Sequence, residues 1–149
     1  MDIVIREANE MDINNGLLEV YIEGYRFHQN GRPDIFIDLS DDELESDLIN
    51  NMKNQNTLVL LRDDRVVAYL SYVIKKRHTK KLDMDQIVVL EKYRKCGYGK
   101  MLIDRVLEIG RELKCDRIEF NCWMFNTNAL EAYDHMGFKH QRIQYEMKL

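Results

Sequence analysis

The segment from Arg94 to Lys100 combines two glycines with flanking basic residues, a pattern suited to holding a phosphate. Its residues are Arg94, Lys95, Cys96, Gly97, Tyr98, Gly99 and Lys100. Glycine lets a backbone turn tightly and approach a ligand without a Cβ in the way. The first amides of a helix lack intrahelical partners and carry the positive end of the helix dipole, so they favour anions. The sequence therefore predicts a phosphate- or pyrophosphate-binding turn, with Arg94 and Lys95 adding positive charge.

Two nucleotide-binding patterns and one purely structural role are alternative interpretations of this turn. A nucleoside triphosphatase needs G-x-x-x-x-G-K-[ST], but Arg94 replaces the first glycine and Met101 the serine or threonine. A dinucleotide site needs G-x-G-x-x-G, and Leu102 occupies the third glycine position. Both nucleotide patterns fail. The turn by itself leaves open whether it binds a ligand or only begins a helix.

The apolar periodicity around the turn changes repeatedly between strand and helix patterns. Alternating or β-branched runs predict strands over residues 3–6, 57–61, 66–74, 82–89, 118–122 and 143–149. Helical spacing predicts helices over residues 11–28, 40–53, 97–113 and 129–136, and Ser40 with Glu43 matches a capping box for the second of them. This β-α-α-β-β-β-α-β-α-β order predicts an α/β fold. Its central sheet is mixed, largely antiparallel and flanked by helices, with a strand–helix–strand crossover late in the chain.

The bulk composition fits an ordinary globular protein. The 149 residues are 45% hydrophobic and 32% charged, so we expect residues 1–149 to form a single domain. No leader-like or membrane-spanning run is present, which predicts a cytoplasmic protein without a membrane partner. The three cysteines and four histidines show neither a disulfide framework nor metal-ligand spacing, so we expect free thiols and no metal. A net charge of −4 argues against nucleic acid as a partner.

A second motif follows the glycine turn at a distance. The spacing N-x-x-A-x-x-x-Y-x-x-x-G-F is met by Asn126, Ala129, Tyr133, Gly137 and Phe138. Together, the two motifs resemble the GCN5-related N-acetyltransferase (GNAT) family, and the resemblance is strong over residues 57–149 and thin before them. It implies a GNAT-type acyl-CoA N-acyltransferase fold, with acetyl-CoA as co-substrate and an amine as acceptor. It also implies a homodimer.

The resemblance also implies where the coenzyme binds. Backbone groups of residues 87–89 would bind the acetyl carbonyl and the pantetheine arm where the sheet splays, the turn amides would hold the pyrophosphate, and Asn126 would bind the coenzyme arm. Cys96 departs from the family's usual small polar or basic residue, but only its amide is needed. The candidate coenzyme-binding residues are Ile87, Val88, Val89, Arg94, Lys95, Cys96, Gly97, Tyr98, Gly99, Lys100 and Asn126.

Acetyl transfer to an amine needs an acid and a base. By resemblance, Tyr133 would face the coenzyme sulfur as general acid. A lysine-like amine has a pKa of about 10.4, so a nearby carboxylate would help to present it neutral. Asp83 and Asp85 share one face of the strand that enters the site, by the period of two. We take Asp85 as the candidate base, against the alternative that both are solvent-facing strand residues, which suits Asp83 better.

Two other functions compete with catalysis. A non-catalytic acyl-CoA-binding regulatory module would use the same turn, but it has no need of a tyrosine acid at the sulfur. A nucleic-acid-binding role for the basic run 75–81 conflicts with the acidic balance. Residues 11–56, which wall the acceptor side in this family, are the least family-like part of the chain. The acceptor is therefore open among small amines, polyamines, aminoglycosides, amino acids and protein amino groups.

Overall fold

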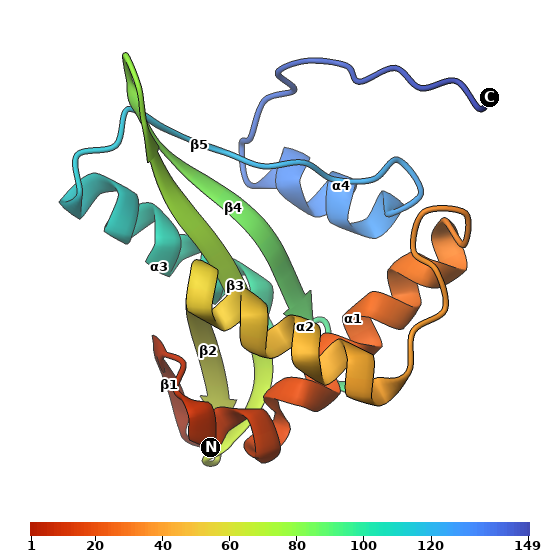
Figure 1. Cartoon of the computed structure of the whole chain (residues 1–149). Helices are drawn as coiled ribbons and strands as arrows, with labels where there is room; N and C mark the ends of the chain where they lie inside the picture. The colour runs from red at the N-terminus through yellow and green to blue at the C-terminus, as the bar shows by residue number, and fades with distance from the viewer.

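The computed structural model describes residues 1–149 as one five-stranded sheet with helices on both faces (Figure 1). The strands are β1 (Ile3–Glu7), β2 (Asn56–Arg62), β3 (Arg65–Lys76), β4 (Lys80–Val89) and β5 (Arg117–Glu119). The helices are α1 (Leu18–Gly31), α2 (Asp41–Asn54), α3 (Tyr98–Glu112) and α4 (Thr127–His135), with short helical turns η1 (Glu10–Asp12), η2 (Ile13–Leu17) and η3 (Glu91–Tyr93).

The sheet has the order β1-β2-β3-β4-β5, antiparallel except for the parallel pair β4–β5. The predicted α/β fold with a mixed, largely antiparallel sheet is confirmed. The hairpin between β2 and β3 turns through Asp63 and Asp64, both with positive φ (47° and 66°), as a two-residue turn of the type that suits twisted strands.

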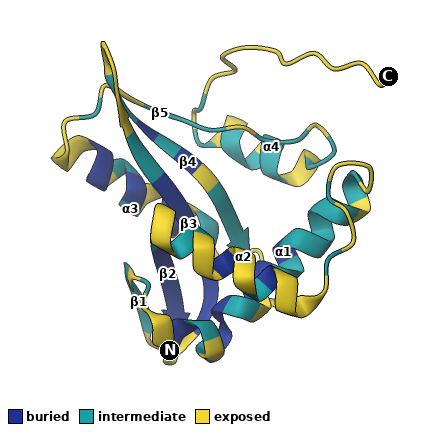
Figure 2. Cartoon of the chain, in the orientation of Figure 1, coloured by how far each residue is buried: buried dark blue, intermediate teal, exposed yellow.

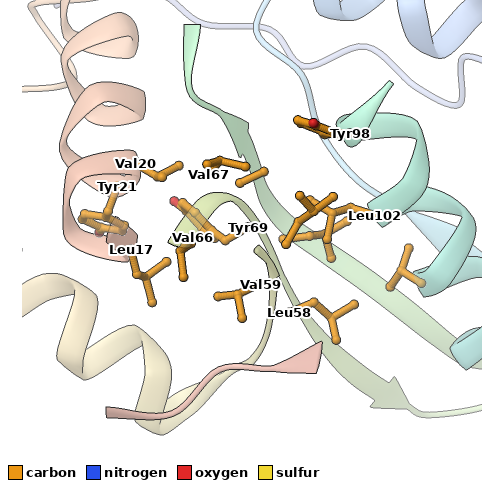
Figure 3. Packing of buried hydrophobic residues seen from close by; sticks show 14 of the residues in the cluster. Leu17, Val20, Tyr21, Leu58, Val59, Val66, Val67, Tyr69, Tyr98 and Leu102 are labelled. Atoms are coloured by element: carbon orange, nitrogen blue, oxygen red, sulfur yellow. The ribbon is translucent and has the colours of Figure 1, made fainter. Parts of the chain in front are cut away.

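Both faces of the central strands are covered, so their sequences are nearly continuous apolar runs. Residues 58–61 and 66–72 are buried along their whole length, as expected of strands packed on both sides. Leu17 of η2 and Val20 of α1 cover one face and Leu102 of α3 covers the other (Figure 3). Burial is concentrated in these central strands and in the helix faces turned toward them (Figure 2).

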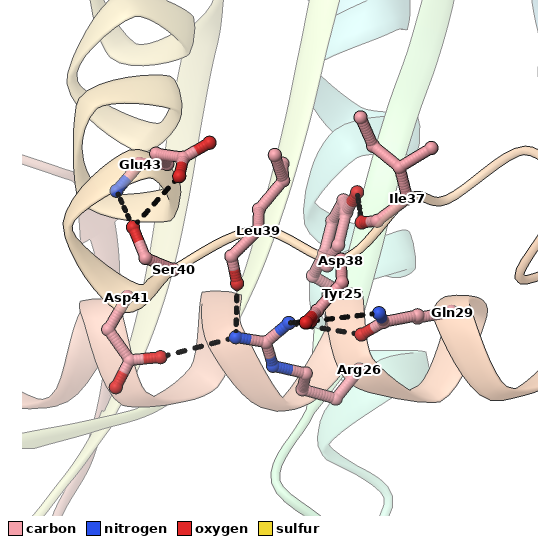
Figure 4. Close-up of polar contacts among 9 residues, drawn as sticks. All are labelled: Tyr25, Arg26, Gln29, Ile37, Asp38, Leu39, Ser40, Asp41 and Glu43. Carbon is pink, nitrogen blue, oxygen red and sulfur yellow. Dashed lines mark hydrogen bonds and ion pairs between the residues drawn. The ribbon is translucent and has the colours of Figure 1, made fainter.

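The loop between α1 and α2 is fastened to α1 by side-chain hydrogen bonds (Figure 4). The Tyr25 hydroxyl donates to the Ile37 carbonyl at 2.7 Å, and an Arg26 Nη donates to the Leu39 carbonyl at 2.6 Å. Ser40 caps α2 as predicted, because its Oγ accepts from the Glu43 amide at 3.1 Å. The second half of the capping box differs, since the Glu43 carboxylate accepts from the Ser40 hydroxyl rather than from its amide.

The first helix begins later than the prediction from residue 11. The chain instead passes through η1 and η2 before α1 starts at Leu18. Gly16 interrupts the helical path with a φ of +108°, and a Cβ there would lie 2.4 Å from the Val66 carbonyl oxygen. The chain therefore winds irregularly where it passes against the backbone of β3.

The predicted strand over 143–149 is wrong. Residues 138–149 belong to no strand, and no backbone group from residue 139 to 149 is hydrogen-bonded to another backbone group. An alternating sequence makes a strand only when a sheet edge is available to pair with it, and this segment runs away from the sheet in Figure 1. The strand predicted over 118–122 is also shorter, since only residues 117–119 pair with β4.

None of the helices has the length and apolar content required to cross a membrane. All three cysteines are free thiols, as predicted.

Candidate active site

Strands β4 and β5 separate after a short parallel contact. They pair only over residues 81–83 of β4 and 117–119 of β5. Farther along β4, residues 87–89 pair with β3 on one side, and their other edge has no strand beside it. In Figure 1, the chain leaves β5 toward α4 while β4 continues toward α1. Backbone groups of Ile87, Val88 and Val89 therefore border an open wedge, at the point where the sheet was predicted to splay.

A β-bulge coincides with this separation. Ser71 of β3 pairs with Gln86, whereas Tyr72 pairs with Met84, so Asp85 is the extra residue on β4. A bulge bends its strand and increases the local twist. Because it lies just after the last β4–β5 pair, at Asp83, it turns β4 away from β5 and places Asp85 beside the wedge.

The glycine turn lies between β4 and α3, with its amides free. Lys95 and Gly97 both have positive φ (64° and 82°), and α3 begins directly after Gly97. None of the backbone amides from Lys95 to Lys100 donates to another backbone group, and the first such bond of the helix runs from Met101 to Gly97. A row of unpaired amides at the positive end of a 15-residue helix is suited to an anion such as a pyrophosphate.

The basic side chains around the turn are held differently. The Arg94 guanidinium lies over the Phe27 ring at 5.7 Å, which links the turn to α1. The Lys100 ammonium pairs with Asp104 one helical turn later at 2.7 Å. Lys95 and Cys96 are exposed and project into solvent beside the free amides. The turn therefore presents positive charge without enclosing it.

Tyr133 lies on α4, across the wedge from β4. Its half-buried ring packs edge-on against Phe120 at 4.7 Å and against Phe138 at 6.1 Å. Burial raises the pKa of the Tyr133 hydroxyl above its ordinary value, and the nearby Cys122 adds to the rise. The hydroxyl makes no hydrogen bond to another residue and is not sealed from solvent. It is therefore protonated at neutral pH, and its proton is available to a ligand.

Asn126 precedes α4 with its side chain uncommitted. Its backbone amide donates to the Trp123 carbonyl at 3.0 Å, and its carbonyl accepts from Leu130 at 3.1 Å. Its side chain makes no capping bond to the helix. The side-chain amide thus remains free for a ligand.

The two candidate carboxylates differ in their partners. Asp83 accepts from the Lys75 ammonium at 2.6 Å and is neutralised by it. Asp85 is exposed, pairs with no cation and accepts only from the Gln55 side-chain amide at 3.0 Å. This difference favours Asp83 as a structural residue and leaves the charge of Asp85 uncompensated.

Two tyrosines, Tyr21 and Tyr69, lie near Asp85. The Tyr69 hydroxyl donates to Gln86 at 2.7 Å, and the Tyr21 hydroxyl accepts from Asn51 at 3.0 Å. Burial, followed by the charges of Asp47 and Asp85, raises the pKa of Tyr21 to about 12, and burial raises the pKa of Tyr69 well above its ordinary value. Both hydroxyls therefore stay protonated, so neither can serve as a base near neutral pH.

Sequence reasoning did not find Gln55 or Phe27, which hold Asp85 and Arg94. Each lies tens of residues from its partner, and no spacing rule links them. Trp123 was interpreted as a packing residue, and it does pack, on Phe36 at 5.7 Å and on Phe125 at 6.2 Å.

The fold and its open wedge are those predicted from the two sequence motifs. Residues 17–138 match the Acetyltransferase (GNAT) family, and the chain belongs to that family. Because this family transfers acetyl groups from acetyl-CoA to amines, the predicted family, enzyme class and co-substrate are confirmed at family level.

Known relatives agree with this membership. The chain is 30% identical over 78 residues to the uncharacterized N-acetyltransferase YvbK of Bacillus subtilis, a match covering 52% of this chain and 50% of YvbK. The matched part thus spans half the length of that relative.

Solved structures share the fold over nearly their whole length. The tetramutant of the BH1408 protein from Bacillus halodurans has a TM-score of 0.83 at 21% identity, covering 98% of this chain and 99% of that chain. Glucosamine-6-phosphate N-acetyltransferase from Arabidopsis thaliana has a TM-score of 0.71 at 16% identity, covering 99% of both chains. The aminoglycoside N-acetyltransferase AAC(6′)-Iy, solved in complex with CoA, has a TM-score of 0.71 at 19% identity, covering 99% of this chain and 95% of that chain.

Replacing Gly97 by valine should weaken acetyl-CoA binding by an order of magnitude or more. A branched side chain at a φ of +82° is strained by about 1–2 kcal/mol or more, and relieving the strain would move the free amides. The variant should still fold, because a Cβ at Gly97 meets nothing within 4 Å. Calorimetry would measure the affinity, with Cys96→Ser as the control expected to bind like wild type. Unchanged affinity in folded Gly97→Val would refute the phosphate assignment.

Proposed function

We propose that this protein transfers the acetyl group of acetyl-CoA directly to an amine, with Tyr133 as general acid and Asp85 assisting deprotonation of the amine. The single observation that carries the proposal is the open β4 edge, which leads at one end into a turn whose amides have no backbone partner. Acetyl-CoA supplies an activated thioester. The chain has to bind its pyrophosphate, position its acetyl group and move two protons.

Binding is assigned to the turn and the strand edge. The amides from Lys95 to Lys100 would hold the pyrophosphate, with Arg94 adding charge. Unpaired backbone groups of residues 87–89 would hydrogen-bond the extended arm and the acetyl carbonyl, much as another strand would. Asn126 would bind the arm from the α4 side. The geometry supports these roles because the turn amides have no backbone partner, the edge of residues 87–89 that faces away from β3 has no strand beside it, and the Asn126 side chain makes no capping bond.

Proton transfer is assigned to opposite walls of the wedge. As the amine nitrogen bonds to the carbonyl carbon and the carbon–sulfur bond breaks, Tyr133 would donate its proton to the departing sulfur. Its raised pKa keeps that proton in place until then. Asp85, directly or through water, would take the proton that the amine loses. Asp85 is suited to accept this proton, because Tyr21 and Tyr69 nearby are held protonated and Asp83 on the same strand is paired with Lys75.

A non-catalytic acyl-CoA-binding module is the alternative, and it would use the same turn. The predicted homodimer, cytoplasmic location and absence of a nucleic-acid partner stay predictions, as does the organisation of residues 1–149 as one domain.

Release of coenzyme A, followed with a thiol reagent over an amine panel, tests the proposed function. The panel should hold small amines, polyamines, aminoglycosides, amino acids and peptides with free amino groups. We expect acceptor-dependent release with at least one class, and mass spectrometry should find one acetyl group on that acceptor. Tight acetyl-CoA binding with no turnover on any class would favour the binding module instead.

Asp85→Asn should slow turnover most at acidic to neutral pH. The loss should shrink as rising pH deprotonates the amine without help, because the base is then no longer needed. Rate-versus-pH profiles of wild type and Asp85→Asn measure this, with Asp83→Asn as the matched control on the same strand. We expect the control to keep the wild-type profile. A wild-type profile in Asp85→Asn would remove Asp85 as the base.

Tyr133→Phe keeps the ring packing and removes the proton donor. Turnover should fall by roughly 10²- to 10⁴-fold, the usual range for lost acid–base catalysis, while acetyl-CoA affinity changes little. Tyr72→Phe is a matched control, because Tyr72 is a buried tyrosine on another element, β3. If Tyr133→Phe turns over within a few-fold of wild type, the thiolate leaves unaided and Tyr133 is a packing residue.

A further inference from the structure

One side of α2 carries a row of polar residues that ends at Asp85. We call it the α2 row. Its members follow one another every fourth residue, so they lie one above the other on the helix: Glu43, Asp47, Asn51 and the C-cap residue Gln55. Asn51 donates to the Tyr21 hydroxyl of α1 at 3.0 Å, and Gln55 donates to Asp85 at 3.0 Å. The α2 row therefore runs beside α1 and leads to the proposed base.

The two carboxylates of the α2 row have no cationic partner. Asp47 is exposed and is engaged in neither an ion pair nor a side-chain hydrogen bond, and the Glu43 carboxylate accepts only from the Ser40 hydroxyl (Figure 4). Arg26 of α1 pairs with Asp38 instead, at 3.2 Å. The negative charge of the row is therefore uncompensated within the chain.

The charge of Asp47 acts on two tyrosine hydroxyls of α1. Burial is the main cause and Asp47 the next, and together they raise the pKa of Tyr21 to about 12 and the pKa of Tyr25 above its ordinary value. Asp85 adds to the rise at Tyr21. A carboxylate from α2 and another from β4 thus act on the same hydroxyl. The space beside Tyr21 is negative, in contrast to the basic turn proposed to hold the pyrophosphate.

Two buried oxygens near the end of the α2 row have no hydrogen-bond partner, Gln55 Oε1 and Ser71 Oγ. Because the Gln55 amide nitrogen donates to Asp85, its unpaired oxygen belongs to the group that contacts the carboxylate. An amide oxygen can only accept hydrogen bonds. Since buried polar atoms in native proteins are nearly always satisfied, this oxygen indicates a ligand that brings N–H donors to Asp85.

Ser71 adds a second unpaired group on the same side of the sheet. Its side chain is only 3% exposed, and it pairs across the sheet with Gln86, the residue after Asp85. Tyr69, two residues earlier on β3, shares the face of Ser71 and packs on Tyr21 of α1 with ring centroids 6.1 Å apart. The Ser71 hydroxyl is therefore directed toward the α1 side of the sheet, where the α2 row ends.

We propose that the acceptor is a linear polyamine, with the attacked amine at Asp85 and a second ammonium group bound by Asp47. The inference rests on the proposed acetyl transfer and names its acceptor. At ~1.5 Å per residue, positions 47 and 55 lie about 12 Å apart along the helix, a span suited to an unbranched chain of several carbons. An ammonium group carries three N–H donors, the kind of partner that Asp85 and Gln55 Oε1 lack. The second ammonium keeps its proton and is held by the unpaired carboxylates.

Three acceptors of equal length test the proposal by coenzyme A release. 1,6-Diaminohexane, 6-amino-1-hexanol and 6-aminohexanoate each offer a primary amine and differ in the far end, which is positive, neutral or negative. Per amino group, kcat/KM should be at least about fivefold higher for the diamine than for the amino alcohol, and lowest for 6-aminohexanoate. Equal values for diamine and amino alcohol would overturn the polyamine inference and leave acetyl transfer standing. No release with any amine would overturn both.

Asp47→Asn tests which residue selects the second charge. The ratio of kcat/KM for the diamine to that for the amino alcohol should fall toward one. Glu45→Gln is the matched control, because it removes one carboxylate from the opposite side of the same helix and should keep the wild-type ratio. Neither side chain belongs to the core, so both variants should fold. A ratio unchanged in Asp47→Asn, or lowered equally in both variants, would overturn the assignment of the second ammonium to Asp47.

Discussion

The brevity of the contact between β4 and β5 is the constraint on which the rest of the site depends. Parallel neighbours normally continue side by side, satisfying each other's backbone groups. Here the contact ends at Asp83, and the bulge at Asp85 bends β4 aside. Residues 87–89 are left with an unsatisfied edge, and the same change of direction brings β4 into the turn whose amides begin α3. One local departure from sheet geometry thus creates both parts of the proposed coenzyme site.

Packing of α1 against β4 and against the chain that leaves β5 keeps the wedge open. Phe125, on the chain leaving β5, lies against α1 so closely that a Cβ on Gly31 would be 2.3 Å from its ring. Phe27, His28 and Trp123 surround the same ring within 5.8 to 6.2 Å. α1 also presses on β4, since a Cβ on Gly24 would lie 2.8 Å from a Val88 methyl group. One helix therefore fixes both walls, and the missing side chains of Gly24 and Gly31 set how closely it can approach them.

The sequence predicted what local periodicity and short motifs can specify. The helices after the glycine turn and before Gly137 and the order of the first five strands along the chain all follow from the spacing of apolar residues. Gln55 beside Asp85 could not be predicted, because the contact arises where the end of α2 meets β4 and no pattern links residues so far apart. The strand expected over 143–149 failed for a related reason. The sequence of this segment does alternate, but alternation shows only that one face of the segment is apolar. It does not specify which sheet edge the segment would pair with.

Unpaired backbone underlies the proposed chemistry. The inner edge of β4 borders the wedge, so only a thin, extended ligand with alternating donors and acceptors can pair with it, and a pantetheine arm has that form. A ligand that must leave after each turnover can pair only through a few groups, and residues 87–89 offer only a few. The same short edge can therefore position the arm of the coenzyme and still release it.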